Sequence, residues 1–167
     1  MASTTFNTIV VRTNNPDNMQ QRVREGLANG AITPGELLIW DSTVNDLNQH
    51  ATAGGNSEGK KVAIENPWSD HGSGKAIDHP YADNETVRFI FAQTGDQLYM
   101  FLADGQTVSQ GASLVSDATG ALAAGGAQAV NEAGSATYTV YPDGVVGYAA
   151  EDKAASGARA RILVDIA

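Results

Sequence analysis

The sequence contains no cysteine among its 167 residues, which excludes disulfide bonds and cysteine-based zinc or redox sites. Charged residues are also scarce, at 17% of the chain compared with about 25% in typical soluble domains. The rarer sign is positive, with 10 Lys and Arg against 19 Asp and Glu, and the net charge is -9. This charge would repel the phosphates of DNA and RNA, so no nucleic acid partner is expected.

Long apolar runs are absent as well. The longest, residues 87–92 and 98–103, fall far short of the roughly 20 residues that a membrane helix needs, and the N-terminus has no basic-then-apolar signal pattern. We therefore expect no membrane partner. The chain is instead rich in glycine, with 18 residues, and in small polar residues, which indicates a β-rich protein with many turns.

The clearest strand patterns lie in the middle of the chain. Residues 86–92 and 98–103 alternate their side chains with a period of two, and both faces of each segment are largely apolar. Such two-sided strands are typical of the centre of a barrel or sandwich. The turn-prone residues 93–97 between them predict that the two strands pair as a hairpin in the core.

Other segments give weaker patterns. β-branched residues at 6–12 predict a strand or an extended arm, and apolar residues at four-residue spacing predict one short helix over 19–28. Residues 117–137 are rich in Ala and Gly and have little to bury, so a loop is expected there. The even-numbered positions of 159–166 are all apolar, which predicts a final strand, paired with 145–151.

One pattern occurs twice in the chain. The string "GELLIWDST" at 35–43 aligns without gaps to "GASLVSDAT" at 111–119, and one deletion brings Leu47 onto Leu122. In both copies the unit is a turn, a short strand, an Asp-headed turn and a return strand. We expect two similar hairpins in one sheet system.

The residues most suggestive of chemistry are two Asp-His pairs on either side of a Gly-Ser-Gly-Lys run. The pairs are Asp70-His71 and Asp78-His79. A Walker-type phosphate loop is excluded, because a serine stands in the place of its first Gly and Ala76 in the place of its final Ser or Thr.

Carboxylate and imidazole groups are also metal ligands, and His50 adds a third imidazole to those of the two pairs. Neighbouring residues of an extended chain point to opposite sides, so each pair would supply one ligand and leave the site incomplete. We therefore predict no metal and no other cofactor. A serine hydrolase is not indicated either, because Ser73 lacks the Gly-x-Ser-x-Gly spacing.

Two aromatic residues, Trp68 and Tyr81, flank the same loop. Aromatic side chains of this kind often lie at the centre of protein interfaces. They also plug the ends of barrels. Both interpretations make the loop a recognition or structural feature rather than a catalytic one.

The order and spacing of several blocks carry more information than any single residue. The blocks are "AITPGELL", "HATAGG", "VAIENP", "PYADNETVRFIFAQTGDQLYMFLADGQTVSQGASLVSDATGAL" and "VVGYAAEDKAASGARARILVDI". Together they resemble the head decoration (cement) proteins of tailed bacteriophages, over nearly the whole chain from Ile9 to Ile166.

Proteins of that family are small β proteins without catalytic residues that add to the outside of an expanded capsid, commonly as trimers. The resemblance implies a mainly β fold, a small β-barrel or β-tulip-like domain with an extended N-terminal arm and at most one short helix. It divides the chain into an arm at 1–15 and a single β-rich decoration domain at 16–167. The implied partners are the phage major capsid protein and further copies of the chain in a homotrimer, and the implied location is the outer surface of the virion capsid.

The resemblance also implies which residues make these contacts. In the arm, Phe6, Ile9, Val11 and Arg12 would cover or augment a capsid strand, a mode in which backbone hydrogen bonds supply much of the affinity. A second set, in the loop, would lie at the trimer interface: Trp68, His71, His79 and Tyr81.

Two other classes of function stay open on the sequence. One is a carbohydrate-binding β module in which Trp40, Trp68 and Tyr81 form a stacking platform. The other is a metal-dependent hydrolase centred on the Asp-His pairs. We favour the non-enzymatic capsid protein over both.

Overall fold

The computed structural model describes residues 5–14, 16–42, 44, 46–57, 59–67, 75–126 and 144–167. Helical turns within these ranges are three or four residues long, and none could cross a membrane. They are η1 (Pro16–Asn18), α1 (Met19–Arg22) and η2 (Ala76–Asp78). The strands are β1 (Val10–Arg12), β2 (Val23–Leu27), β3 (Leu37–Trp40), β4 (Leu47–Gln49), β5 (Lys61–Ala63), β6 (Thr86–Phe91), β7 (Gln97–Leu102), β8 (Thr107–Val108), β9 (Ser113–Ser116), β10 (Leu122–Ala124), β11 (Val145–Ala149), β12 (Lys153–Ala154) and β13 (Ala160–Ile166). The mainly β fold with at most one short helix is confirmed.

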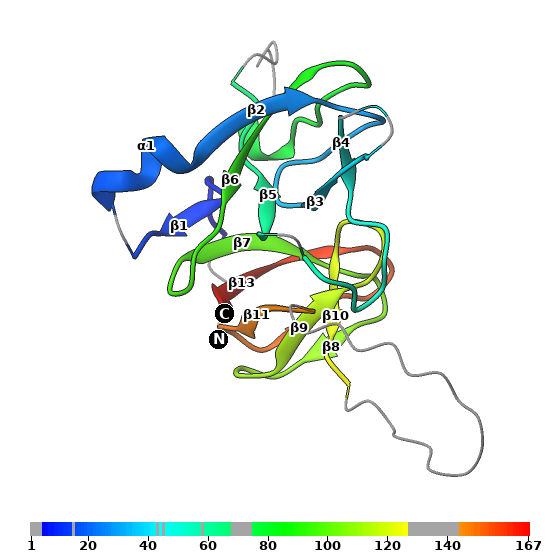
Figure 1. Ribbon diagram of the computed structural model, residues 1–167. Helices are drawn as coiled ribbons and strands as arrows, with labels where there is room; N and C mark the ends of the chain where they lie inside the picture. Colours follow the sequence, from blue (N-terminus) through cyan, green and yellow to red (C-terminus); the bar gives the residue numbers. More distant parts are fainter. Residues whose placement is uncertain are drawn as a thin grey trace, which may run out of the picture.

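A small closed barrel occupies the lower half of the molecule in Figure 1. Its strands follow the order β7, β10, β9, β11 and β13, and β13 pairs back onto β7 to close the ring. The β7–β13 pairing is antiparallel and runs from Ala160 opposite Leu102 to Asp165 opposite Gln97. At the other seam β10 meets β7 in parallel, with Leu122 opposite Leu102. Each strand of the ring therefore pairs with a neighbouring strand on both sides.

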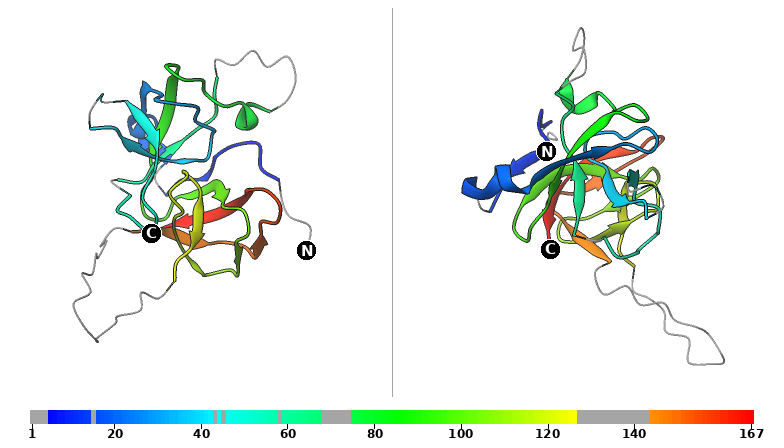
Figure 2. Two further views of the ribbon diagram at one scale, coloured as in Figure 1. Left: turned by 90° about the vertical axis from the view of Figure 1, so that its right-hand side faces the viewer. Right: turned by 45° about the horizontal axis from the view of Figure 1, so that its top comes forward.

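A second sheet, in the upper half of Figure 1, has the strand order β2, β6, β5, β3 and β4. Its two outer strands approach each other where Ala28, just beyond β2, forms a parallel bridge with Leu47. Gly26 lies at this approach, because a Cβ atom there would be 2.8 Å from Leu47 Cδ1 and 3.1 Å from Trp40 Cη2. The sheet therefore curls around its own side chains. Figure 2 shows it beside the barrel in two further views.

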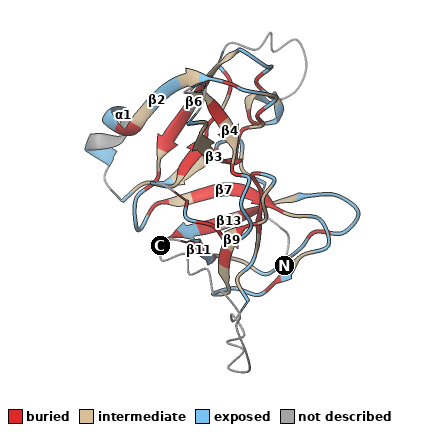
Figure 3. Ribbon diagram, turned by 45° about the vertical axis from the view of Figure 1, so that its right-hand side comes forward, coloured by how far each residue is buried: buried red, intermediate tan, exposed pale blue. Residues whose placement is uncertain are grey.

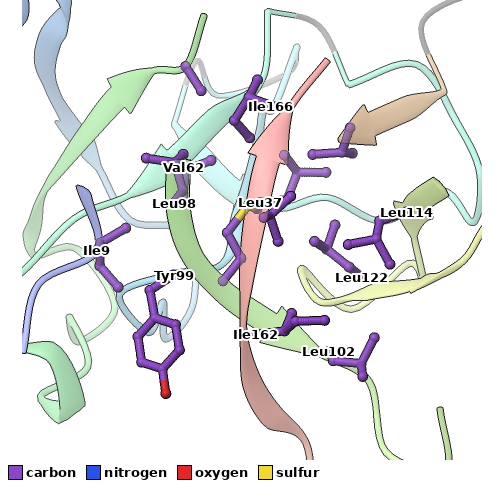
Figure 4. Packing of buried hydrophobic residues seen from close by; sticks show 14 of the residues in the cluster. Ile9, Leu37, Val62, Leu98, Tyr99, Leu102, Leu114, Leu122, Ile162 and Ile166 are labelled. Carbon is purple, nitrogen blue, oxygen red and sulfur yellow. The ribbon is translucent and has the colours of Figure 1, made fainter. Parts of the chain in front are cut away.

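A shared hydrophobic cluster joins the two sheets. Leu98 and Ile162 enter it from the barrel, and Leu37 and Val62 enter it from the second sheet. Figure 4 shows Leu37 and Val62 close to Leu98 on β7. A smaller cluster, which includes Phe89, lies within the curled second sheet. Figure 3 accordingly shows burial concentrated on β6, β7 and β13, where the two sheets cover each other.

The strands predicted in the middle of the chain are both present, as β6 and β7, but their predicted pairing as a hairpin is wrong. β6 pairs with β2 and β5 in the second sheet, whereas β7 pairs with β1, β10 and β13. Both edges of β6 are thus occupied by other strands. Its two faces are also covered separately, since Phe89 belongs to the smaller cluster and Ile90 to the shared one. The chain crosses from one sheet to the other between these strands.

The helix predicted over 19–28 ends at Arg22, so the prediction is wrong for its second half. Val23–Leu27 is instead β2, paired antiparallel with β6 along its whole length. The physical reason is visible in the residues. β-branched Val23 and Gly26 are poor helix formers, and strand pairing with β6 satisfies the backbone groups of Gly26. A helix would also carry Gly26 away from the side chains that pack against it.

Both predicted copies of the hairpin are confirmed, because β3 pairs with β4 and β9 pairs with β10. Leu47 and Leu122 hold equivalent positions in the two registers, as the alignment predicts. Their predicted place in one sheet is wrong, since the first hairpin belongs to the second sheet and the other to the barrel. The hairpins meet at the junction instead, where Leu37 N–H donates to Gly120 O at 2.7 Å.

The final strand is confirmed as β13, which pairs with β11 and buries Ile162, Val164 and Ile166. The loop expected over 117–137 is wrong for Leu122–Ala124, which form β10. Leu122 is fully buried in the shared cluster, so one large side chain is enough to fix this strand. Residues 127–137 of this predicted loop lie outside the described residues.

Gly147 tests how closely β11 and β13 approach. A Cβ atom at Gly147 would lie 2.4 Å from the backbone oxygen of Asp165 on β13. We expect Gly147→Ala to lower the free energy of unfolding, measured by urea denaturation, by about 1–3 kcal/mol, because the backbone of β13 must move. Gly126→Ala is the matched control, since its Cβ would meet nothing within 4 Å. Equal losses in the two variants would contradict this account.

Candidate binding surface

The N-terminal segment lies along the barrel. β1 pairs antiparallel with β7, and just before it Tyr99 N–H donates to Ile9 O at 2.8 Å. Ile9 is fully buried, and its N–H donates to Glu65 Oε1. Figure 4 shows Ile9 beside β7. Phe6 packs edge-on against the Tyr99 ring, with the ring centroids 5.3 Å apart. The segment is therefore seated on the body of the protein at Phe6 and at Ile9.

The described end of the Asp-His loop is tied to the same region by Arg161 of β13. Its guanidinium lies 3.4 Å from Asp78 Oδ1 of η2 and donates to Ile77 O at 2.5 Å. It also donates to Pro34 O at 2.7 Å, and it lies 6.0 Å from the centre of the Tyr99 ring. One guanidinium thus connects β13, η2 and the turn before β3, next to the ring on which Phe6 packs.

We call the region formed by residues 5–8, Tyr99, 76–79 and Arg161 the arm–loop surface. Burial lowers the pKa of Arg161, and the nearby Asp78 carboxylate opposes this, so the guanidinium stays cationic at neutral pH. Burial raises the pKa of the Tyr99 phenol, which therefore stays neutral. Such groups suit binding through charge and hydrogen bonds rather than proton transfer at neutral pH.

The Pro34-Gly35 turn explains how this region packs so closely. Gly35 has a φ of +94°, which favours glycine, and a Cβ atom there would lie 2.7 Å from Arg161 Nη1 and 3.0 Å from Tyr99 O. The Cβ would also lie 3.2 Å from Ile9 Cδ1. Any larger residue would push apart the side chains of the arm–loop surface and the anchor of the N-terminal segment.

The buried carboxylate of Asp96 fixes the end of the N-terminal segment at Thr13 and Asn14. This carboxylate is fully buried and accepts hydrogen bonds from Thr13 Oγ1 at 3.1 Å, Asn14 N–H at 3.0 Å and Gln93 N–H at 2.9 Å. It also forms an ion pair of 2.5 Å with Arg22. Burial alone would raise the pKa of Asp96, but the hydrogen bonds from Arg22, Gln93 and Asn14 outweigh it and hold the pKa below 3.8.

The residues implied for capsid contact do not all face outward. Ile9 is part of the shared cluster, so its side chain is not available to a partner in this conformation. Phe6 and Val11 are partly buried against the same cluster, and Arg12 is exposed. Apolar residues of a terminal arm can pack in a partner's groove or in the chain's own core. Ile9 packs in the chain's own core.

The residues implied for a trimer interface are also divided. Trp68 and His71 lie outside the described residues. Tyr81 is fully buried, with its hydroxyl 2.9 Å from Glu65 O and 3.1 Å from Ile64 O, and burial raises its pKa. Tyr81 is therefore a core residue rather than an interface residue. His79 is half-buried at the end of η2.

The stacking platform expected for a carbohydrate-binding module is not formed by its described members. Trp40 is half-buried and packs edge-on against Phe89, with centroids 5.8 Å apart. Tyr81 is enclosed, so the two rings offer no shared exposed face. Each aromatic side chain is used to fill the second sheet.

The candidate metal ligands are likewise dispersed. Asp78 pairs with Arg161, and the Asp70-His71 pair lies outside the described residues. Within the described ranges, no group of three or more His, Cys, Asp and Glu side chains could hold a metal ion.

His50 takes part in a contact that sequence reasoning missed. Its Nδ1 lies 2.8 Å from Ser116 Oγ, and its Nε2 lies 2.8 Å from Asn56 O. A carbonyl oxygen only accepts, so Nε2 carries the proton and Nδ1 accepts from Ser116. The pair resembles a nucleophile and its base, but His50 and Ser116 are 0% and 1% exposed, which closes them to a substrate. The contact joins the ends of the two similar hairpins.

No protein-family model matches the chain, and no curated protein matches it.

A substitution of Asp96 tests directly whether its buried contacts hold the N-terminal segment in place. We expect Asp96→Asn to lower the free energy of unfolding by about 3–5 kcal/mol, because it leaves the Arg22 guanidinium buried without its counter-charge. Urea denaturation followed by fluorescence measures this. Asp165→Asn is the control, since Asp165 is exposed and accepts one hydrogen bond from Gln97. A loss of unfolding free energy as small as that of the control would show that the buried Asp96–Arg22 pair does not fix the start of the N-terminal segment.

The same pair predicts a pH dependence. Because the pKa of Asp96 is lower in the folded protein than its ordinary 3.8, the ionised carboxylate stabilises the fold above pH 3.8. This contribution is lost as the pH falls below 3.8 through the folded-state pKa. The difference in unfolding free energy between the parent protein and Asp96→Asn should therefore be constant from about pH 7 to about pH 5, and smaller at about pH 3. A difference that is unchanged at low pH would count against the assignment.

Proposed function

We propose that this protein is a capsid decoration (cement) protein of a tailed bacteriophage. It adheres as a trimer to the outer surface of the head and stabilises the shell by bridging neighbouring capsomers. Its partner is the major capsid protein, and its role is adhesion without bond-making chemistry. The resemblance of its ordered sequence blocks, from Ile9 to Ile166, supports this assignment.

The observation that carries the proposal is the arm–loop surface. The N-terminal segment and the loop are the two parts of the chain to which the resemblance assigns contacts with the shell and with other copies. Both lie against the Tyr99–Arg161 region of the barrel, through Phe6 on Tyr99 and Asp78 on Arg161. A bridging protein needs its contact segments held in a fixed relation, and this arrangement supplies that relation.

The burial of Ile9 refines how the arm would act. Ile9 anchors the N-terminal segment to the protein's own core. Exposed residues around it, such as Asn7, Thr8 and Arg12, make the contact with the shell. The extended backbone of this segment offers additional hydrogen bonds, as in strand addition. Each copy contributes one such segment, so a trimer gains affinity by avidity even where each contact is modest.

The charge of the chain agrees with a place outside the shell. A net charge of -9 disfavours contact with packaged nucleic acid and helps to keep the protein in solution before it binds. Recognition of the shell then rests on shape and on hydrogen bonds more than on general electrostatic attraction.

Co-sedimentation with expanded heads that lack this protein tests the proposal. We expect the parent protein to pellet with the heads in a fixed stoichiometry, and a chain lacking residues 1–8 to bind at least tenfold more weakly through lost avidity. This truncation keeps Ile9 and the Asp96 contacts, so we expect the fold to be preserved, which circular dichroism checks. Arg12→Glu should also weaken binding, whereas Lys153→Glu, the same charge reversal on β12, should not. Failure of the folded parent protein to pellet with the heads would overturn the proposal.

A further inference from the structure

A hollow of about 300 Å³ lies between the segment that follows β2 and the end of β4. These two parts of the chain meet at the parallel bridge between Ala28 and Leu47, where Asn29 N–H donates to Leu47 O at 2.8 Å. Figure 1 shows β4 beside the end of β2. Among the described residues no bridge joins the two segments beyond this point, so they separate and leave the hollow between them. The hollow shares no residue with the arm–loop surface.

Side-chain amides and small residues line this hollow. The amides belong to Asn29, Asn48 and Gln49. The small residues are Gly30, Ala31, Ala51 and Ala118. Among the described residues, no charged side chain lines it. A ligand that complements such a surface is neutral, and it both donates and accepts hydrogen bonds.

Neighbouring carboxylates fix the orientation of the amides. Asn48 Nδ2 donates to Asp41 Oδ2 at 3.0 Å, and Asn29 Nδ2 lies 3.4 Å from the same oxygen. Gln49 Nε2 donates to Glu36 Oε2 at 2.9 Å. A carboxylate only accepts hydrogen bonds, so the NH₂ group of each amide faces its carboxylate. In the described part of the chain no hydrogen bond to the three amide oxygens is found, which leaves them available to a ligand.

The backbone of Gln49 adds one donor and one acceptor. His50 N–H donates to Leu37 O of β3 at 2.9 Å, and the backbone groups of successive strand residues point to alternate sides. The N–H and C=O of Gln49 therefore face away from β3, toward the side on which Asn29 binds Leu47 O. Within the described ranges, no hydrogen bond to either group of Gln49 is found.

This combination of groups matches a hexopyranose, the ring form of a six-carbon sugar. Neighbouring hydroxyls of the ring both donate and accept, so one amide can accept from the first hydroxyl and donate to the second. The C–H groups of the ring are apolar and pack well against methyl groups such as those of Ala31 and Ala51. A metal ion would use the amide oxygens, but it would gain nothing from the methyl groups or from the N–H of Gln49.

We propose that this hollow binds a neutral hexopyranose, free or as a unit of a glycan. Asn29, Asn48 and Gln49 bind its hydroxyls, and the alanine methyl groups pack against its ring. Because Asp41 and Glu36 orient the amides before the sugar arrives, little side-chain freedom is lost on binding. The site is distinct from the aromatic platform considered above, and it does not depend on the proposed function.

An NMR titration of the isotope-labelled full chain tests the site. The probes are the methyl α-D-glycosides of glucose, galactose and mannose. The control is hydroxymethyl-tetrahydropyran, which keeps the ring and lacks the ring hydroxyls. We expect at least one glycoside to shift the side-chain amide resonances of Asn29 and Asn48 and the backbone amide resonance of Gln49, and the control to shift none of them, because these groups bind hydroxyls.

The free sugar of the same configuration is titrated beside its methyl glycoside. Equal affinity would assign the hollow to a unit of a glycan, and tighter binding of the free sugar would assign it to the free form. The absence of shifts with all of the glycosides, or equal shifts with the control, would overturn the proposal. Shifts of the same resonances by calcium chloride or propylammonium chloride, with none by the glycosides, would assign a cation instead and would also overturn it.

Variants supply a second readout, the dissociation constant of the glycoside. Asn29→Ala and Asn48→Ala each remove one amide and should weaken binding about three- to tenfold. Ala51→Met fills the hollow from an exposed position, leaves the amides in place and should abolish binding. Gln97→Ala is the matched control, since Gln97 also donates to a carboxylate, Asp165 Oδ1 at 2.8 Å, but lies on the barrel. Binding that survives Ala51→Met, or that falls equally in Gln97→Ala, would contradict the assignment.

Discussion

The ion pair between Asp96 and Arg22 holds the corner at which the chain passes from the second sheet to the barrel. The Asp96 carboxylate accepts hydrogen bonds from the segment before η1, from α1 and from the turn that follows β6. A charge enclosed in this way is stable only while its partners stay in place, since removal of one partner leaves the other buried and unpaired. The position of the N-terminal segment relative to both sheets follows from this corner.

A second set of polar contacts joins the two sheets elsewhere. Arg159 pairs with the fully buried Glu36, and the guanidinium groups of Arg159 and Arg161 lie 4.1 Å and 4.2 Å from the centre of the Phe101 ring. The shared apolar cluster contains residues of both sheets. Burial of that cluster supplies most of the attraction between the sheets, whereas the charged contacts fix their relative orientation.

How much could be foreseen from the sequence depended on how local each signal was. The alternation over 159–166 predicts β13 well, because the period of two can be recognised within this one segment without knowledge of its partners. The hairpin predicted for β6 and β7 is wrong, because adjacency in sequence favours a hairpin and nothing local shows that each strand has other partners. Arg22 and Asp96 lie 74 positions apart, so their contact has no sequence pattern. The roles of Ile9 and Tyr81 were also hidden, since burial and interface contact call for the same apolar side chains.

The closed ring has a consequence for how the protein folds. Its longest seam joins β7 to β13, and β1 joins β7 from the other end of the chain, so the barrel is complete only after distant segments meet. Bringing such segments together costs loop-closure entropy before any contact rewards it, which makes folding slow for a chain of this size. Unpaired strands are exposed during that interval, and the scarcity of long apolar runs in this sequence then limits aggregation on the way to the native state.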